Sequence, residues 1–144
     1  MKTFKQHITE VKTASMWDFL YRKNKGVFWR GEGKLGSGMD IGALGAGIYL
    51  TWSESMAGAF AKRAGGTVKQ YQVKRGLKIA DNRGDDFQNI LTDMGFSRGE
   101  YAGDKMFANL MKIRLSRLGY DGAVSDNVAE GIVIFDKKNV TLLK

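Results

Sequence analysis

The stretch Gly45-Ala46-Gly47-Ile48-Tyr49-Leu50-Thr51-Trp52-Ser53 carries the strongest fold signal in this chain of 144 residues. Its glycines precede a short run of β-branched, aromatic and aliphatic residues, which predicts a strand over residues 48–52. Ser53 or Ser55 is placed to cap the helix that we expect over Met56–Ala64. The stretch therefore predicts a strand that turns directly into a helix.

Further short strands and helices are expected on both sides of this stretch. Alternating or continuous apolar runs predict strands over 27–30, 67–74, 77–80, 123–124, 131–135 and 140–143. Periodic apolar residues predict helices over 11–23, 86–94 and 105–118, the last ended by Gly119. The glycine-rich segment 31–47 is expected to be a loop and not a packed element. This order of elements predicts one α+β domain with mostly antiparallel strands.

The composition excludes several kinds of chemistry. The chain has no cysteine and a single histidine, His7, so disulfides, thiolate chemistry, serine–histidine catalysis and multi-histidine metal sites are ruled out. No apolar run approaches the roughly 20 residues that span a bilayer. The N-terminus also lacks the apolar core of a signal peptide. We therefore expect a monomer of the cytoplasm, with no secretion signal, transmembrane segment or membrane partner.

The charge balance points to a polyanionic partner. The 23 basic and 15 acidic residues give a net charge of +8 at pH 7. Such a surface attracts nucleic acid in a salt-sensitive manner. A merely well-hydrated surface explains the charge equally well, because the basic residues are spread along the chain and form no block.

Three residues are candidates for chemistry, and each has an ordinary structural alternative. Arg30 ends an apolar strand, and its guanidinium matches phosphate or ribose oxygens, although an ion pair with Glu32 is the alternative. The ring of Tyr49 suits stacking against a flat, positively charged ring, although a strand tyrosine is more often part of the core. Glu130 precedes a buried strand and is suited to stabilising an oxocarbenium-like transition state, or it is a solvated charge at the strand end.

The order and surroundings of these residues resemble those of the ADP-ribosyltransferases over about residues 27–140. The matching pieces are Phe28-Trp29-Arg30-Gly31, residues 47–53 with Ala57, Phe60 and Ala61, then residues 118–124 and 130–136 with Asn139-Val140. Gly-Ile-Tyr before a small-residue helix is similar to the poly(ADP-ribose) polymerase branch. An arginine at the first-strand position is similar to the arginine-first toxin branch. The chain thus resembles an Arg–Tyr–Glu hybrid.

The resemblance implies a split, mostly antiparallel β-sheet of the ADP-ribosyltransferase type with peripheral helices, over residues 11–144. It implies NAD as substrate and no metal. Arg30 would hold phosphate or ribose, Tyr49 would stack on nicotinamide, and Glu130 would bond the 2′-hydroxyl of the nicotinamide ribose. Gly31 and Gly47 would bring backbone groups to the nicotinamide amide, and Thr51, Ser53 and Phe60 would complete the cofactor-binding site.

The implied function is mono-ADP-ribosyl transfer from NAD to a host macromolecule. An NAD glycohydrolase and a catalytically inactive, basic DNA-associated head protein remain as alternatives. Two positions depart from the family pattern. Glu130 lies six residues before Asp136, where many relatives have five, so either a bulge absorbs the extra residue or the carboxylate is displaced. Val128 stands where arginine-modifying relatives carry Glu or Gln, which disfavours arginine as the acceptor.

The first ten residues resemble the capsid-targeting leader of internal head proteins in T-even-like tailed phages. Those leaders are cut after a hydrophobic-x-Glu tripeptide, and Ile8-Thr9-Glu10 fits this pattern. The resemblance implies a cleavable leader over 1–10, a protein packaged in the virion interior beside phage DNA, and delivery into the host cytoplasm. An ordinary amphipathic first helix is the alternative.

Overall fold

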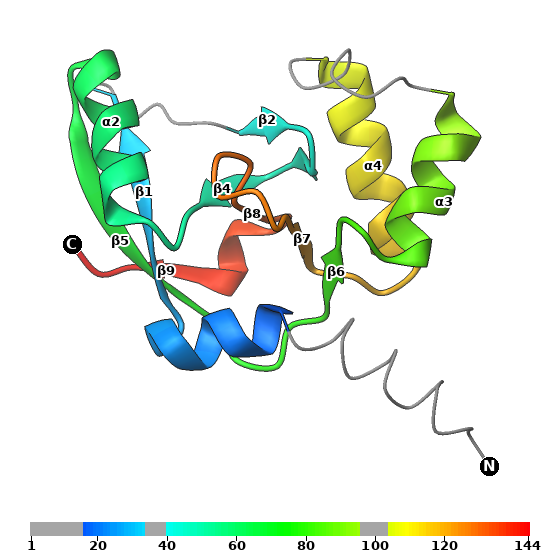
Figure 1. The fold of residues 1–144 in the computed structure, drawn as a ribbon, viewed down its shortest axis with the longest axis horizontal. Helices are drawn as coiled ribbons and strands as arrows, with labels where there is room; N and C mark the ends of the chain where they lie inside the picture. Colours follow the sequence, from blue (N-terminus) through cyan, green and yellow to red (C-terminus); the bar gives the residue numbers. More distant parts are fainter. Residues whose placement is uncertain (1–15, 34–39, 96–103) are drawn as a thin grey trace.

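The computed structural model describes residues 16–33, 40–95 and 104–144. The leader expected over residues 1–10 lies outside the described residues. The fold is mixed α/β with mostly antiparallel strands, as the sequence predicts (Figure 1). Among the described residues, no helix is long and apolar enough to cross a bilayer.

Two sheets form the centre of the molecule. The first has the antiparallel order β1 (Val27–Glu32), β5 (Thr67–Val73) and β9 (Val140–Leu142). The second has the order β4 (Ile48–Leu50), β8 (Ile132–Ile134), β7 (Gly122–Val124) and β6 (Ile79–Asp81), with β6 and β7 parallel. Trp29 and Thr51 join the sheets by two backbone hydrogen bonds of 3.0 and 2.8 Å. The middle of β1 therefore lies beside the end of β4.

The helices flank these two sheets (Figure 1). Helix α2 (Glu54–Ala64) packs on β1 and β5, whereas α3 (Asp85–Met94) and α4 (Lys105–Arg117) pack on each other and on the second sheet. A further helix is described over residues 16–24, and its Trp17 stacks on Phe28 of β1 with ring centroids 5.5 Å apart. A short 3-10 helix, η1 (Lys137–Asn139), leads into β9.

The second sheet is the central layer because it buries both of its faces. Residues of one face, including Leu50, Ile132 and Ile134, pack with Trp17 and Phe28 from the first sheet's side. Residues of the other face, including Tyr49, Ala123 and Val133, pack with the helical cluster of α3 and α4. This two-sided burial explains the continuous apolar run of β8, since a strand covered on both faces needs no polar alternation.

The prediction of a loop over 31–47 was wrong at both ends of that segment. Strand β1 continues to Glu32, and β2 (Ile41–Gly42) pairs with β3 (Gly45–Ala46) in a hairpin that packs against α4. Leu44 at its tip is 1% exposed. Gly45 allows the close approach, because it has φ +124° and a side chain there would meet Phe135 and the backbone of α4. Glycine here serves packing, so glycine content alone was misleading.

Candidate functional site

A cavity of about 170 Å³ opens where the two sheets meet. It lies between the middle of β1, the end of β4, helix α2 and the turn that leads into β8, and we call it the bridge cavity. Its volume is below the roughly 300–1,000 Å³ of pockets that enclose a whole ligand. The bridge cavity therefore suits one ring of a ligand whose remainder lies outside.

The bridge cavity brings together six of the eight site residues named from the sequence, which are Arg30, Gly31, Tyr49, Thr51, Phe60 and Glu130. Gly47 and Ser53 do not line it. Gly47 lies against the backbone of Ile134, and its amide donates to the carbonyl of Asp40 at 2.9 Å. Ser53 is the N-cap of α2, where its hydroxyl accepts from the amide of Met56 at 3.2 Å. The capping prediction for Ser53 is thus confirmed.

Arg30 is fixed from two directions. Its side chain makes an ion pair with Glu32, with 3.1 Å between Nε and Oε2, and Nη1 donates to the carbonyl of Tyr49 at 3.1 Å. Glu32 Oε2 also accepts from the hydroxyl of Tyr71 at 2.8 Å, and burial together with this carboxylate raises the pKa of Tyr71. The ion pair that sequence analysis weighed as an alternative is formed. It places a 9% exposed arginine in the cavity wall.

Tyr49 is more deeply buried than a stacking platform usually is. Its residue surface is 5% exposed, and its ring belongs to the core cluster of α3 and α4. The hydroxyl donates to the carbonyl of Gly45 at 2.7 Å and accepts from the amide of Leu44 at 3.0 Å. Burial raises the pKa of Tyr49 well above its ordinary value. Tyr49 thus ties the β2–β3 hairpin to the central sheet, and its stacking on nicotinamide stays a prediction.

Two half-buried aromatic residues also line the bridge cavity, Phe60 from α2 and Trp29 from β1. The indole Nε1 of Trp29 is buried and has no hydrogen-bond partner among the residues that the structure describes. Sequence analysis quoted Trp29 beside Arg30 and gave it no role. The feature that draws attention to Trp29 is its buried indole N–H, which only a structure reveals. Burying such a donor without a partner costs free energy, so this N–H is an unusual feature of the cavity wall.

Glu130 reaches the cavity through a turn that sets its register. The amides of Glu130 and Gly131 both donate to the carbonyl of Asn127, at 3.0 and 3.1 Å. Gly131 then adopts φ +69° and passes so close to the carbonyl of Leu50 that a side chain would collide with it. Pairing of β8 with β4 begins at the next residue, Ile132. This turn places Glu130 in the lining of the bridge cavity. Its register relative to the ADP-ribosyltransferase pattern stays a prediction.

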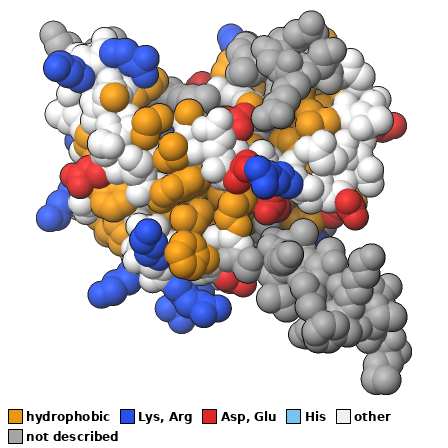
Figure 2. Space-filling view, in the orientation of Figure 1, with side chains coloured by type: hydrophobic (Ala, Val, Ile, Leu, Met, Phe, Trp, Pro, Cys, Tyr) orange, Lys and Arg blue, Asp and Glu red, His pale blue; other side chains and the backbone are white. Residues whose placement is uncertain are grey.

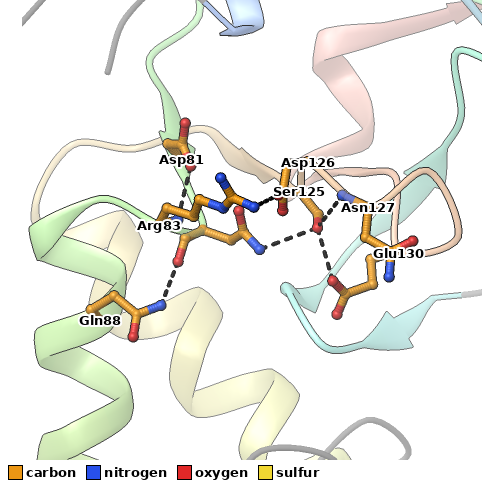
Figure 3. A network of polar contacts seen from close by, with 8 residues as sticks. Asp81, Arg83, Gln88, Ser125, Asp126, Asn127 and Glu130 are labelled. Carbon is orange, nitrogen blue, oxygen red and sulfur yellow. Dashed lines mark hydrogen bonds and ion pairs between the residues drawn. The ribbon is translucent and has the colours of Figure 1, made fainter. Parts of the chain in front are cut away.

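Ser125 determines how Glu130 is held (Figure 3). This serine is fully buried behind the end of β7, and its hydroxyl lies 2.8 Å from Oε1 of Glu130. The hydroxyl oxygen of Ser125 also accepts from the side-chain amide of Asn82 at 3.1 Å and from the backbone amide of Asn127 at 3.0 Å. Two donors occupy its lone pairs, so its single proton is directed to Glu130. Sequence analysis missed Ser125 and Asn82, since neither stands in a recognisable motif.

A second cavity of about 710 Å³ lies on another side of Glu130, and we call it the α3 cavity. Its lining combines apolar groups such as Phe87 with polar groups such as Gln88, and an ion pair between Arg83 and Asp126. Glu130 lines both cavities. A group bound in the bridge cavity and a group entering through the α3 cavity would therefore meet at this carboxylate.

The lining of the bridge cavity carries charges of both signs. Arg30 and the exposed Arg63 of α2 contribute positive charges and Glu130 contributes a negative one, while the charge of Arg30 is balanced by its ion pair with Glu32. No protein-family model, curated protein or solved structure matches the chain. The chemistry of the site therefore has to follow from its own residues.

Proposed function

We propose that the protein is an NAD-dependent mono-ADP-ribosyltransferase, an Arg–Tyr–Glu member of that superfamily, which modifies a macromolecule of a bacterial host. The observation that carries this proposal is the convergence of Arg30, Tyr49 and Glu130 on one cavity from three segments far apart in sequence. Each residue by itself has an ordinary structural role. An arginine, aromatic rings and a serine-held carboxylate around a ring-sized cavity together match the needs of NAD cleavage.

The dinucleotide binds with its nicotinamide ring in the bridge cavity. Trp29 and Phe60 offer aromatic surface to that ring, with Tyr49 behind it. Arg30 and Arg63 attract the pyrophosphate, because guanidinium groups match phosphate oxygens in charge and in donor geometry. The rest of the dinucleotide lies outside, as the small volume of the cavity requires.

Glu130 supplies the stabilisation of the transition state. Its carboxylate accepts a hydrogen bond from the 2′-hydroxyl of the nicotinamide ribose and stabilises the positive charge that develops on the sugar. The bond between C1′ and the nicotinamide nitrogen breaks, and its electron pair leaves with nicotinamide as a neutral amide. The lone pair of the acceptor then forms the new bond to C1′, and the acceptor's proton passes to Glu130 or to solvent.

The acceptor approaches through the α3 cavity, since Glu130 borders that space as well. Water is the alternative acceptor and would make the protein an NAD glycohydrolase. The polar lining of the α3 cavity, with Asn82, Gln88 and Asn127, favours this second candidate, because such groups hold water well. Delivery from a phage virion is proposed only because residues 1–10 resemble a capsid-targeting leader.

Labelled NAD separates these functions. The protein is incubated with NAD labelled in its ADP-ribose part and with bacterial lysate, with and without nuclease. Label on a macromolecule supports transfer, and its loss on nuclease treatment identifies a nucleic-acid acceptor. Free labelled ADP-ribose without labelled macromolecule supports the glycohydrolase. Intact NAD after prolonged incubation overturns both and leaves the inactive DNA-associated protein.

A further inference from the structure

Positive charge is concentrated on one half of the molecule. The half built around the first sheet, residues 16–33, 51–76 and 136–144, holds twelve lysines and arginines and four acidic residues. The remaining described residues, 40–50, 77–95 and 104–135, hold six lysines and arginines and nine acidic residues. Figure 2 shows Lys and Arg side chains along the left and lower left margins, over the first-sheet half. Among the described residues, the excess of positive charge is therefore carried by the half built around the first sheet.

Seven of these basic residues belong to segments that meet at one end of the first sheet. Strand β1 begins, β5 ends and β9 begins at this end, because Val27 pairs with Gln72 and Val73 pairs with Val140. The amide of Val73 donates to the carbonyl of Gly26 at 2.8 Å, which ties the end of β5 to the turn before β1. The segments carry Arg22, Lys23, Lys25, Lys74, Arg75, Lys137 and Lys138, which we call the basic end.

An aromatic ring stands exposed beside these cations. Phe19, on the helix over 16–24, is 62% exposed, and Nζ of Lys23 lies 5.8 Å from the centre of its ring. The exposed ring and Lys23 thus place an aromatic surface beside a cation at the basic end. Proteins bind single-stranded nucleic acid by combining cations that neutralise phosphates with aromatic side chains on which bases stack.

We propose that the basic end binds single-stranded nucleic acid, with phosphates on its lysines and arginines and a base stacked on Phe19. This goes beyond NAD cleavage and does not depend on it. The acidic residues of these segments, the exposed Asp18 and Asp136, leave five positive charges in excess, since seven basic residues stand against two acids. A lipid surface fits less well, because interfacial helices bury a whole apolar face, whereas Phe19 is the one large exposed apolar residue of the helix over 16–24.

The test measures affinity for a fluorescent oligodeoxythymidylate by anisotropy over a series of salt concentrations. Each neutralised phosphate contributes about 0.7 to the slope of log affinity against log salt for a single strand. The double substitution Lys74→Gln with Arg75→Gln should therefore reduce that slope by about 1.4. The matched control is Lys105→Gln with Arg117→Gln, which removes the same charge from exposed positions on α4 and should leave the slope unchanged.

Phe19→Ala tests the stacking part separately. It should weaken the oligonucleotide about tenfold without changing the salt slope, since loss of one stacked base costs roughly 1–3 kcal/mol. Circular dichroism melting confirms that each variant remains folded. Equal slopes for the two double variants would overturn the proposal. So would full affinity in the Phe19→Ala variant, or binding to phosphatidylglycerol vesicles without binding to the oligonucleotide.

Discussion

The two walls of the bridge cavity hold their charged residues in different ways. Arg30, on β1, is 9% exposed, and an ion pair with Glu32 and a bond to a backbone carbonyl fix it. Glu130, on the turn before β8, is half-buried, and the hydroxyl of Ser125 holds it. The first wall is part of what keeps the protein folded. The second is a network of side-chain hydrogen bonds around the buried Ser125. The proposed function assigns binding of the dinucleotide to the first wall and the chemistry to the second.

Removing the arginine should give the largest loss of stability. Arg30→Gln leaves the carboxylate of Glu32, whose side chain is 12% exposed, without its cation. Breaking such a buried pair costs about 3–5 kcal/mol in the free energy of unfolding, measured by urea denaturation. Arg63→Gln, in the same cavity but on an exposed helix position, should cost less than about 0.5 kcal/mol. Similar losses in the two variants would contradict the distinction between a structural and a surface arginine.

The contact between α2 and the arginine wall is tested by a pair of glycines. A side chain at Gly31 would collide with the carbonyl of Ala57 in α2, whereas a side chain at Gly58 meets nothing within 4 Å. Gly31→Ala should therefore destabilise the protein by about 1–3 kcal/mol. Gly58→Ala should stabilise it by about 0.5–1 kcal/mol, because it removes a flexible residue from a helix. Melting curves of both variants measure these changes in stability. A change of the same sign in both variants would argue against close packing of α2 on Gly31.

Ser125→Ala weakens the glutamate wall alone. It removes the proton that is directed to Glu130 and a bond to a charged group, which is worth about 1.5–3 kcal/mol. We expect kcat for NAD cleavage to fall about tenfold or more. KM for NAD should stay unchanged, because the proposed function assigns binding of the dinucleotide to the arginine wall. A variant that raises KM and spares kcat would show that Ser125 supports binding instead, and Ser116→Ala on the exposed face of α4 is the control.

The smallest effect should appear away from both walls, at alkaline pH. The hydroxyl of Tyr120 donates to Asp86 at 2.6 Å, and burial together with this carboxylate raises the pKa of Tyr120 to about 12. Because the folded value is raised above the ordinary value near 10, the stabilisation is complete below about pH 10 and disappears as pH rises toward 12. Tyr120→Phe should remove this dependence from urea unfolding measured across that range. An unchanged pH dependence in the variant would assign it to other groups.

Most elements could be predicted because their signals are local. Ser53 caps α2, and Gly119 follows α4 with φ +88°, as capping rules require. The buried face of α4 does not follow from its apolar residues alone. Met106 and Ile113 are apolar but 63% and 44% exposed, because the helix packs through Phe107, Ala108, Met111 and Leu115. Which apolar residues of a helix are covered depends on its neighbours and not on its own sequence.

The candidate site shows the same contrast between what local sequence predicts and what long-range packing decides. Arg30, Tyr49 and Glu130 were named from their sequence surroundings, and they line one cavity. The bonds that hold them were not foreseen, because Ser125 meets Asn82 only through the parallel pairing of β6 and β7. The two hydrogen bonds of the Tyr49 hydroxyl likewise depend on the β2–β3 hairpin, which was not predicted because its segment is rich in glycine. Long-range pairing, not residue type, created these contacts.

The most direct test of the proposed site is the release of nicotinamide from NAD by the purified protein and by its Glu130→Gln variant. The wild-type protein should release free nicotinamide, and the variant should be slower by at least about 100-fold, because it lacks the carboxylate that stabilises the sugar cation. Glu54→Gln makes the same change at an exposed position of α2 and should release nicotinamide at the wild-type rate. No release by the wild-type protein, or equal release by the wild-type protein and Glu130→Gln, would contradict the assignment of this cavity to NAD cleavage.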